Sequence, residues 1–319
     1  MKKIIFLGFI FVFLLQNNAL SLELKKTIRA EYIMGTIFTI LVYSEEDNLT
    51  EKGINEAFKE IRKYDSILSN YKNDSEINTV LKDAYKKPIK ISNELYDVIN
   101  DCLFFSKLTN GKFDITIEPL VKLWGFKNKN FKKPTLNQIN KIKKDIGYKN
   151  IILDPKYHTL YIKNKNVTLD FGAIGKGYAI GKAANILKLN GIKSAFIDSV
   201  SNQYYLGTPP NQPFWKVGIK DPRNEDKIIK TIEVKDKSVS TSGDYENYFF
   251  DNGIRYSHII DPISGYPIKD SIASTIVCEN SGYADALSTS FLLIDEKKQN
   301  EINKKLKIDY FVVFKNHDK

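Results

Sequence analysis

The chain has 319 residues, of which 42% are hydrophobic and 27% charged, and 48 Lys and Arg against 38 Asp and Glu give a formal net charge of +10. These proportions are typical of a globular protein and exclude a wholly disordered chain. Two cysteines are too few for a disulfide-held scaffold, and 17 glycines and 10 prolines exclude a collagen-like chain. The length suits one large domain or two of ordinary size.

The first 21 residues have the pattern of a secretory signal peptide. Lys2 and Lys3 precede an uncharged run from Ile4 to Leu15, and Ala19-Leu20-Ser21 supplies the small residues of a cleavage site. The run is shorter than the about 20 residues that a membrane-spanning helix needs, so an uncleaved anchor is the less favoured alternative. We therefore expect an exported, periplasmic protein, membrane-associated only if the signal stays uncleaved, with one domain over residues 22–319.

The excess of basic residues is mostly lysine, with no Arg-rich cluster and no alternation of aromatic and basic residues. This pattern predicts solvated surface lysines, and we expect no nucleic-acid partner. Cys102 and Cys278 could pair in an oxidising compartment. Each stands in an apolar context, however, which favours two buried, unpaired thiols.

Hydrophobic periodicity divides the first part of the chain into strands and helices. The alternation from Leu24 to Tyr43 predicts strands, interrupted at Met34-Gly35-Thr36. Spacings of three and four predict a helix over Asn48–Asn70, and a second helix over Ser92–Leu108 has Ser92 as its N-cap. Phe113–Leu120 is expected to be extended.

Short strands alternate with helices in the rest of the chain. Helices are predicted over Leu136–Ile146, over Tyr178–Asn190 after a glycine loop, and over Asp285–Leu293. The predicted strands are Ile151–Leu153, Thr159–Ile162, Val167–Phe171, Ser194–Asp198, Trp215–Ile219, Ile228–Thr241, Tyr256–Ile260, Ile272–Val277 and Phe311–Phe314. Many connections are too short for a crossover helix. The sequence therefore predicts an α+β fold with a mixed, largely antiparallel sheet and packed helices.

A strand, a glycine loop and a helix follow one another at Val167–Phe171, Gly172–Gly177 and Tyr178. A helix N-terminus can bind an anion, and Lys176 could add a full positive charge. The glycine spacing is neither that of a P-loop nor that of a dinucleotide-binding fingerprint. A plain tight turn is therefore an equal alternative.

Asp285 and Thr289 are four residues apart, which places them on one face of a helix. A carboxylate and a hydroxyl are hard oxygen ligands that suit Mg²⁺. The alternative is an acidic residue that interacts with the helix dipole at the N-terminus.

His258 precedes a Pro turn and could be a general base, a phosphate ligand or a structural hydrogen-bonding group. Ser240 to Tyr245 is a turn of small residues that could approach a ligand. No Gly-x-Ser-x-Gly nucleophile motif accompanies these residues, which disfavours a serine hydrolase.

Taken in order, the motifs between Met34 and about Leu293 resemble those of the ApbE family of FAD:protein FMN transferases. The motifs are Met34-Gly35-Thr36; Leu68-Ser69-Asn70-Tyr71 with Ser75-Glu76-Ile77; Gly111-Lys112-Phe113-Asp114 with Glu118-Pro119-Leu120 and Trp124-Gly125-Phe126; Asp170 to Tyr178; Ser242-Gly243-Asp244-Tyr245; His258-Ile259-Ile260-Asp261-Pro262 with Gly265 and Pro267; and Ala284-Asp285-Ala286-Leu287-Ser288-Thr289.

The resemblance implies a Mg²⁺-dependent enzyme, related in fold to the T-fold, that transfers FMN from FAD to a Thr hydroxyl of an acceptor protein and releases AMP. It implies that the acceptor is a membrane-associated redox subunit. By position, the metal ligands would be the Ala173 carbonyl, Asp285 and Thr289, and His258 would lie close to the reacting pyrophosphate. The residues along FAD would be Met34, Tyr71, Lys112, Phe113, Asp114, Asp170, Lys176 and Ile260.

One segment departs from the family pattern, in which a Gly-Gly pair follows the strand equivalent to Ala195-Phe196-Ile197. This chain has Asp198-Ser199-Val200-Ser201-Asn202 instead. Val200 is β-branched and adopts positive φ only at a cost, so we expect a reshaped loop. The departure leaves two alternatives open, an FAD-binding carrier with a degenerate site and an FAD pyrophosphatase that yields FMN and AMP.

Overall fold

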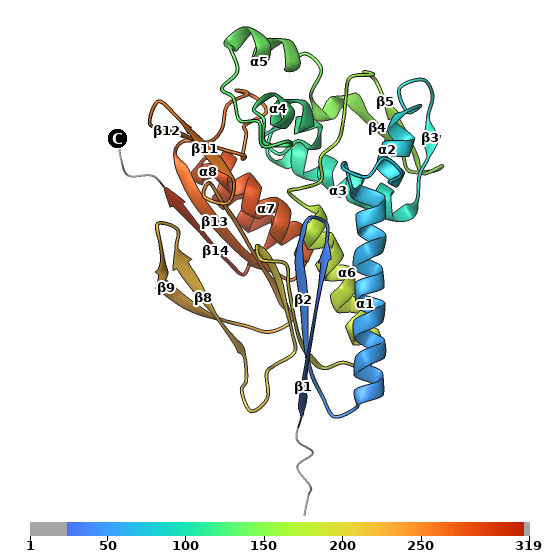
Figure 1. The fold of residues 1–319 in the computed structure, drawn as a ribbon, viewed down its shortest axis with the longest axis vertical. Coiled ribbons are helices and arrows are strands. Elements are labelled where there is room, and N and C mark those ends of the chain that lie inside the picture. Colours follow the sequence, from blue (N-terminus) through green and yellow to red (C-terminus); the bar gives the residue numbers. More distant parts are fainter. Residues whose placement is uncertain (1–23, 316–319) are drawn as a thin grey trace, which may run out of the picture.

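The computed structural model describes residues 24–315, and the predicted signal peptide lies outside this range (Figure 1). Its centre is a seven-stranded sheet in the order β1-β2-β6-β7-β10-β13-β14, in which every neighbouring pair is antiparallel. The strands are β1 Lys25–Ile33, β2 Thr36–Ser44, β6 Ser194–Asp198, β7 Asn202–Leu206, β10 Lys237–Gly243, β13 Ser271–Cys278 and β14 Tyr310–Lys315. This arrangement confirms the predicted α+β fold with a largely antiparallel sheet.

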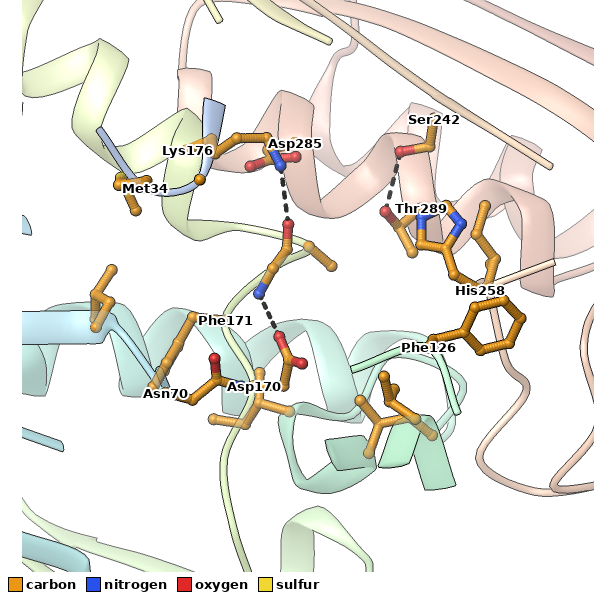
Figure 2. A pocket seen from close by; sticks show the side chains of 18 of the residues that line it. Met34, Asn70, Phe126, Asp170, Phe171, Lys176, Ser242, His258, Asp285 and Thr289 are labelled. Atoms are coloured by element: carbon orange, nitrogen blue, oxygen red, sulfur yellow. Dashed lines mark hydrogen bonds between the residues drawn. The ribbon is translucent and has the colours of Figure 1, made fainter. Parts of the chain in front are cut away.

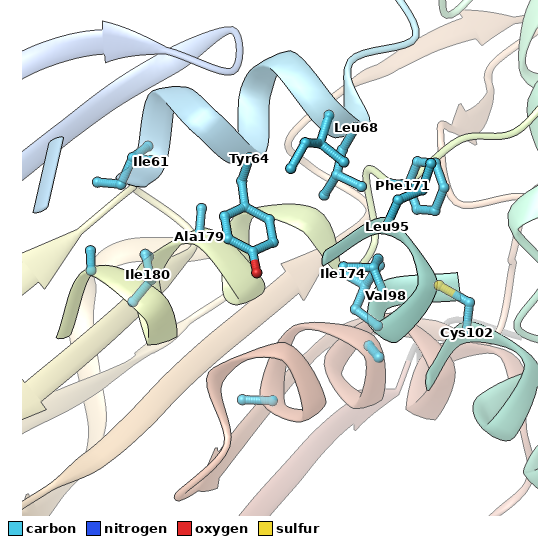
Figure 3. Close-up of a cluster of buried hydrophobic side chains, with 14 of the residues drawn as sticks. Ile61, Tyr64, Leu68, Leu95, Val98, Cys102, Phe171, Ile174, Ala179 and Ile180 are labelled. Carbon is cyan, nitrogen blue, oxygen red and sulfur yellow. The ribbon is translucent and has the colours of Figure 1, made fainter. Parts of the chain in front are cut away.

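Helices cover one face of the sheet. They are α1 Asp47–Leu68, α3 Asn93–Leu108, α6 Gly175–Leu189, α7 Ser281–Leu293 and α8 Glu296–Leu306. Alternate residues of β2, Phe38, Ile40 and Val42, are fully buried beneath them. Figure 3 shows the same core between the helices, where Tyr64 of α1 faces Ala179 of α6. Burial of this continuous apolar surface holds the helices on the sheet.

A smaller region packs around Trp124, next to the helical layer. Its elements are the 3₁₀ turn Ile115–Ile117, α4 Glu118–Leu123, α5 Leu136–Ile142, β11 Tyr248–Asp251 and β12 Ile254–Ser257. The remaining elements, α2 Glu76–Leu81, β3 Ile89–Lys90, the 3₁₀ turn Tyr148–Asn150, β4 Ile151–Asp154 and β5 Thr159–Ile162, adjoin the main core, which buries Ile77, Leu160 and Ile162. Trp124 is fully buried against Tyr256, and its indole N–H donates to the Gly265 carbonyl at 2.9 Å. This contact joins the middle of the chain to a turn far along the sequence.

A two-stranded hairpin, β8 Trp215–Asp221 and β9 Asn224–Val234, packs on the other face of the large sheet. It buries Tyr205, Val239 and Val277. Arg223, in the turn of the hairpin, makes a bidentate ion pair with the buried Asp244, with N–O distances of 2.7 and 2.8 Å. Within residues 24–315, no helix has the length and apolarity to cross a membrane.

Several predicted elements form as expected. The hairpin β1–β2 turns at Met34 and Gly35, and Ser92 caps α3 by accepting a hydrogen bond from the Leu95 N–H. The strands Thr159–Ile162 and Ser194–Asp198 have the predicted bounds. Cys102 and Cys278 are both free, and Cys102 is buried as expected, whereas Cys278 is only partly buried.

Other predictions were wrong. Phe113–Leu120 is not extended, because the Asp114 carboxylate accepts the Thr116 N–H and begins a 3₁₀ turn that runs into α4. Val167–Phe171 forms no strand, and the Asp170 N–H donates to the Ile115 carbonyl of that turn instead. The helix expected over Leu136–Ile146 ends at Ile142.

The two helices that carry the motif residues begin earlier than predicted. Helix α6 starts at Gly175 instead of Tyr178, and α7 starts at Ser281, capped by Asn280, instead of at Asp285. Asp285 therefore stands in the second turn of α7. The alternative in which it stabilises the helix N-terminus through the dipole is thereby disfavoured.

The loop after β6 also differs from the expectation. Val200 has a φ of 69°, the conformation that we expected a valine to avoid. The Ser201 N–H donates to the Ser199 carbonyl at 2.9 Å, which makes a three-residue γ-turn centred on Val200.

Candidate active site

A pocket of about 820 Å³ opens where the β1–β2 turn, the N-terminal part of α6, helix α7 and the Trp124 region meet. Every predicted site residue lines it, and Figure 2 shows several of them facing the same space. They are Met34, Tyr71, Lys112, Phe113, Asp114, Asp170, Ala173, Lys176, His258, Ile260, Asp285 and Thr289. The chain thus brings residues that are up to some 250 positions apart to one cavity.

Close contact between α6 and α7 fixes Asp285. The Gly177 N–H donates to Asp285 Oδ2 at 2.9 Å, and Asp285 is only 3% exposed. A Cβ on Gly177 would lie 2.3 Å from the Ser281 carbonyl oxygen, so only glycine allows the two helices to approach this closely. The predicted glycine loop therefore serves helix packing at Gly177, and that N–H binds a side chain.

The pKa of Asp285 is raised by burial, and the positive charge of Lys176 and the Gly177 N–H oppose this effect. Lys176 also reaches back to the loop before its own helix, with Nζ 3.4 Å from the Gly172 carbonyl. The Gly172 N–H in turn donates to Asp170 Oδ1 at 2.7 Å. The chain Asp170–Gly172–Lys176 holds the loop at the pocket wall (Figure 2).

Three oxygen donors of the predicted metal site lie on this wall. Thr289 is one turn after Asp285, and its hydroxyl lies 3.0 Å from Ser242 Oγ. Ala173 lines the pocket in the turn before α6. A carboxylate, a hydroxyl and a backbone carbonyl fit Mg²⁺ by their chemistry. The described residues contain no cluster of three or more His, Cys, Asp or Glu that could bind a metal, and this donor set, with one carboxylate, would not form one.

His258 is held by its neighbours in a neutral form. Its Nδ1 lies 3.2 Å from the Asn247 carbonyl, and Phe126 meets the ring at a steep angle. Burial lowers the pKa of His258 to about 4, although the Asn247 carbonyl raises it slightly. With Nδ1 donating to a carbonyl, Nε2 is the nitrogen that can accept a proton.

Aromatic and apolar surfaces line another part of the pocket. Tyr71 is 71% exposed, and Lys127 Nζ lies 4.2 Å from the centroid of its ring. Phe113 and Ile260 are buried in the wall, and Lys112 forms an ion pair with Asp261 at 2.6 Å. An exposed aromatic face beside buried apolar groups can hold a planar ring system.

Asp114 has a different environment from the other predicted residues. Its carboxylate accepts hydrogen bonds from the Thr116 N–H at 2.8 Å and the Tyr148 N–H at 2.7 Å. Burial raises the pKa of Asp114, and these hydrogen bonds oppose the rise. The side chain therefore holds two turns together at the edge of the pocket.

Sequence reasoning missed pocket residues that adjoin the recognised motifs. Glu246 directly follows the Ser242–Tyr245 turn and lines the cavity. Desolvation raises its pKa, Lys176 lowers it and Asp285 raises it, so both charges are near. Tyr32 and Ser201 also line the pocket. Extending the turn motif by one residue would have included Glu246, and Ser201 belongs to the Asp198–Asn202 loop that departs from the family pattern, whereas nothing local singles out Tyr32.

The comparisons with known proteins agree with this geometry. The model of the ApbE family matches residues 34–312. A Treponema pallidum protein named FAD:protein FMN transferase is 29% identical over 286 residues, covering 85% of this chain and 79% of the relative. A Vibrio cholerae protein of the same name is 27% identical, covering 89% of this chain and 86% of the relative.

Solved structures match along nearly the whole chain. The crystal structure of the Thermotoga maritima ApbE protein superposes with a TM-score of 0.81 at 28% identity, covering 92% of this chain and 97% of that one. The apo form of the Pseudomonas stutzeri flavinyl transferase ApbE gives a TM-score of 0.79 at 26% identity, covering 92% of this chain and 96% of that one.

Proposed function

The chain belongs to the ApbE family, and from this premise we propose that it is an exported FAD:protein FMN transferase. The proposed reaction moves FMN from FAD to a threonine hydroxyl of an acceptor protein, depends on Mg²⁺ and releases AMP. The observation that carries the proposal is the single pocket that collects every residue carried over from the family pattern.

The two kinds of surface in the pocket suit the two parts of FAD. Tyr71, Phe113 and Ile260 offer aromatic and apolar area for the isoalloxazine ring. Lys176 offers a positive charge for the pyrophosphate, next to the oxygen donors around Asp285. The cavity of about 820 Å³ is within the size range of cofactor sites.

Ala173, Asp285 and Thr289 would hold the Mg²⁺. When bound, the metal would neutralise charge on the phosphate oxygens and on the leaving group. Asp285 is pre-positioned for this task, because the Gly177 N–H already orients its carboxylate.

In the proposed transfer, the threonine oxygen of the acceptor forms a bond to the phosphorus of the FMN moiety. The bond from that phosphorus to the bridging oxygen breaks, and AMP leaves with the electron pair. The hydroxyl proton passes to His258 Nε2 or to the Glu246 carboxylate, the two proton acceptors at this end of the pocket. Because the attacking hydroxyl belongs to the partner, the absence of a serine hydrolase motif is expected.

The test combines residues 22–319 with FAD, Mg²⁺ and the protein acceptor of the Vibrio cholerae relative. In-gel flavin fluorescence on the acceptor together with AMP in solution would support the transferase. FMN and AMP without a labelled acceptor would instead indicate the pyrophosphatase. Bound FAD with neither product would indicate the carrier.

We further propose that the protein acts in the periplasm on a membrane-associated redox subunit. The signal-peptide pattern of the first 21 residues supports export. Cell fractionation and N-terminal sequencing of the full-length chain test this point. A cytoplasmic protein that keeps Met1 would contradict it.

A further inference from the structure

The outer face of the seven-stranded sheet is covered at one part and bare at another. The β8–β9 hairpin (Figure 1) buries Tyr205 and Val239, and its Trp215 reaches Tyr43 at the end of β2 that is farthest from the β1–β2 turn, with ring centroids 6.2 Å apart. At the tip of β1–β2 nothing in the described chain takes that place. There Tyr32 is 76% exposed, Ile37 is 55% exposed and Val200 is 74% exposed.

These three side chains stand at the same end of the sheet, and we call them the apolar row. Tyr32 of β1 pairs directly with Ile37 of β2. Because directly paired residues point to the same face, Tyr32 and Ile37 lie on the outer face of the sheet. Thr39 of β2 pairs with Asp198, the last residue of β6, and Val200 follows in the turn between β6 and β7, at the same end of the sheet as Ile37.

The opposite face of β1 is linked to α1, so the bare face does not result from a detached hairpin. Ion pairs between partly exposed side chains join Lys25 to Asp47 at 2.7 Å and Arg29 to Glu51 at 2.7 Å, and Glu31 to Arg62, all toward α1. Charged residues thus mark the side of β1 that faces α1, and apolar residues mark the side that faces solvent. This is the reverse of the usual pattern, in which apolar side chains are turned inward.

Val200 adds an observation of a different kind. Its φ of 69° and the γ-turn between Ser199 and Ser201 form a conformation that glycine adopts freely and a β-branched residue adopts under strain. The exposed valine side chain contributes little to the core. Strained residues of this type are concentrated at functional sites, because only a role outside folding favours keeping them.

The apolar row continues into the pocket described above. Tyr32 lines that pocket, and so do the turn residues Met34 and Gly35 that follow it. At the other end of the row, Ser201, directly after Val200, lines the same pocket. A molecule resting on the row would therefore touch the pocket mouth at both ends.

We propose that the apolar row is the docking surface for the acceptor protein, which presents its threonine to the pocket and apolar side chains to Tyr32, Ile37 and Val200. This inference rests on the proposed transferase function, since that reaction requires a second protein at the pocket mouth. A few side chains near the centre of a contact supply most of its binding energy, and tyrosine, as at Tyr32, is prominent among them. The row recognises the acceptor, while the pocket holds FAD.

The main test replaces Ile37 with lysine, which places a charge at the centre of the row without touching the pocket lining. The matched control is Ile152→Lys, on β4, where the replaced isoleucine is 42% exposed and is not part of the pocket lining. We expect Ile37→Lys to raise the KM for the Vibrio cholerae acceptor about tenfold, the effect of losing one interface anchor. The affinity for FAD and the KM of the control should stay at the wild-type values.

The outcomes separate the docking surface from the proposed function. If the wild-type protein labels no acceptor, both the proposed function and the docking surface are contradicted. A wild-type protein that labels the acceptor, with an unchanged acceptor KM in Ile37→Lys, overturns the docking surface alone. A dimer of the wild type that becomes a monomer in Ile37→Lys, by sedimentation, would assign the row to self-association and also overturn the proposal.

A second variant keeps the proposal testable if the lysine disturbs folding. Val200→Gly removes the side chain and relieves the strain, so the melting temperature should rise. We expect the acceptor KM to rise severalfold in this more stable protein. Increased stability with an unchanged acceptor KM would mean that Val200 has no part in docking.

Discussion

Positions 177 and 200 would each suit a glycine, for different reasons, yet only position 177 has one. At Gly177 the neighbouring helix leaves no room, since a Cβ would lie 2.3 Å from the Ser281 carbonyl. At Val200 the obstacle is the positive φ, and the side chain itself is in solvent. Inside the molecule, packing decides the residue. At the rim, the chain keeps a side chain that its backbone disfavours, which indicates that the side chain has a use.

Asp285, which the Gly177 contact holds in place, is the residue whose replacement should have the largest effect. Asp285→Asn keeps an oxygen for the Gly177 N–H but removes the charge, so the fold should persist. We expect labelling of the acceptor to fall about 100- to 1,000-fold, the usual cost of removing a group that stabilises charge in the transition state. Labelling rates measured over a range of Mg²⁺ concentrations test this. Wild-type labelling at low Mg²⁺ by this variant would refute the proposed metal site.

The helix contact is tested by Gly177→Ala. Because the added Cβ meets backbone, α6 and α7 must separate, and we expect the free energy of unfolding to fall by about 2–3 kcal/mol. Labelling should fall as well, since Asp285 moves with α7.

Gly181→Ala is the control for this helix contact. It lies one turn along the same helix, where the Cβ would be 3.3 Å from the Ser281 side chain. At this position the higher helix propensity of alanine should offset the tighter contact, so the free energy of unfolding should stay within about 1 kcal/mol of the wild type. Urea unfolding of both variants measures the two free energies of unfolding. Equal losses of stability in the two variants would contradict a special role of the Gly177 contact.

His258 makes the interior sensitive to acid. Its pKa is lowered by burial to about 4, so the unfolded chain, with a pKa near 6.5, binds the proton more readily. The stability that neutral His258 contributes is therefore present above pH 6.5 and is lost as the pH falls toward 4. Between pH 7 and pH 5 we expect a loss of about 2 kcal/mol from this group.

Unfolding free energies at both pH values, for the wild type and His258→Gln, measure the histidine's contribution. The wild type should lose more stability than the variant. Parallel losses in the two proteins would show that His258 does not titrate in this way.

The smallest expected effect lies at the rim. Val200→Gly should raise the free energy of unfolding by about 1 kcal/mol, because a left-handed conformation costs an L-residue roughly that much. Thermal unfolding measures the gain, and Val200→Ala, which keeps a Cβ, should give less of it. A destabilised Val200→Gly would mean that the valine is not strained, which would remove one support of the docking surface.

Local signals were sufficient for part of the fold. Ser92 predicted the start of α3 because a capping hydroxyl bonds within its own turn. Phe113–Leu120 and Val167–Phe171 were misassigned because apolar periodicity cannot distinguish an extended strand from an irregular segment buried by its neighbours. The pairing of β7 and the position of α8 also depend on contacts that no short window contains.

The candidate site follows the same division. Family motifs in the sequence identified the residues from Met34 to Thr289 that line the pocket, and helical spacing placed Asp285 and Thr289 on one face. Glu246 was missed because it follows the recognised turn motif by one residue, and Tyr32 was missed because it belongs to the pocket only through the arrangement of distant segments. The contact between Gly177 and Asp285 was missed for the same reason.

By itself, the sequence determined the alternation of strands and helices, the family resemblance and the hard oxygen donors, because these are properties of residue type and near spacing. The tertiary structure alone decided that α7 can approach α6 closely at Gly177, that His258 is kept neutral, and that Tyr32 and Ile37 pair on an exposed face with Val200 at the same end of the sheet. These features depend on the distance and register between segments far apart in the chain, and such distances arise only when the core is packed.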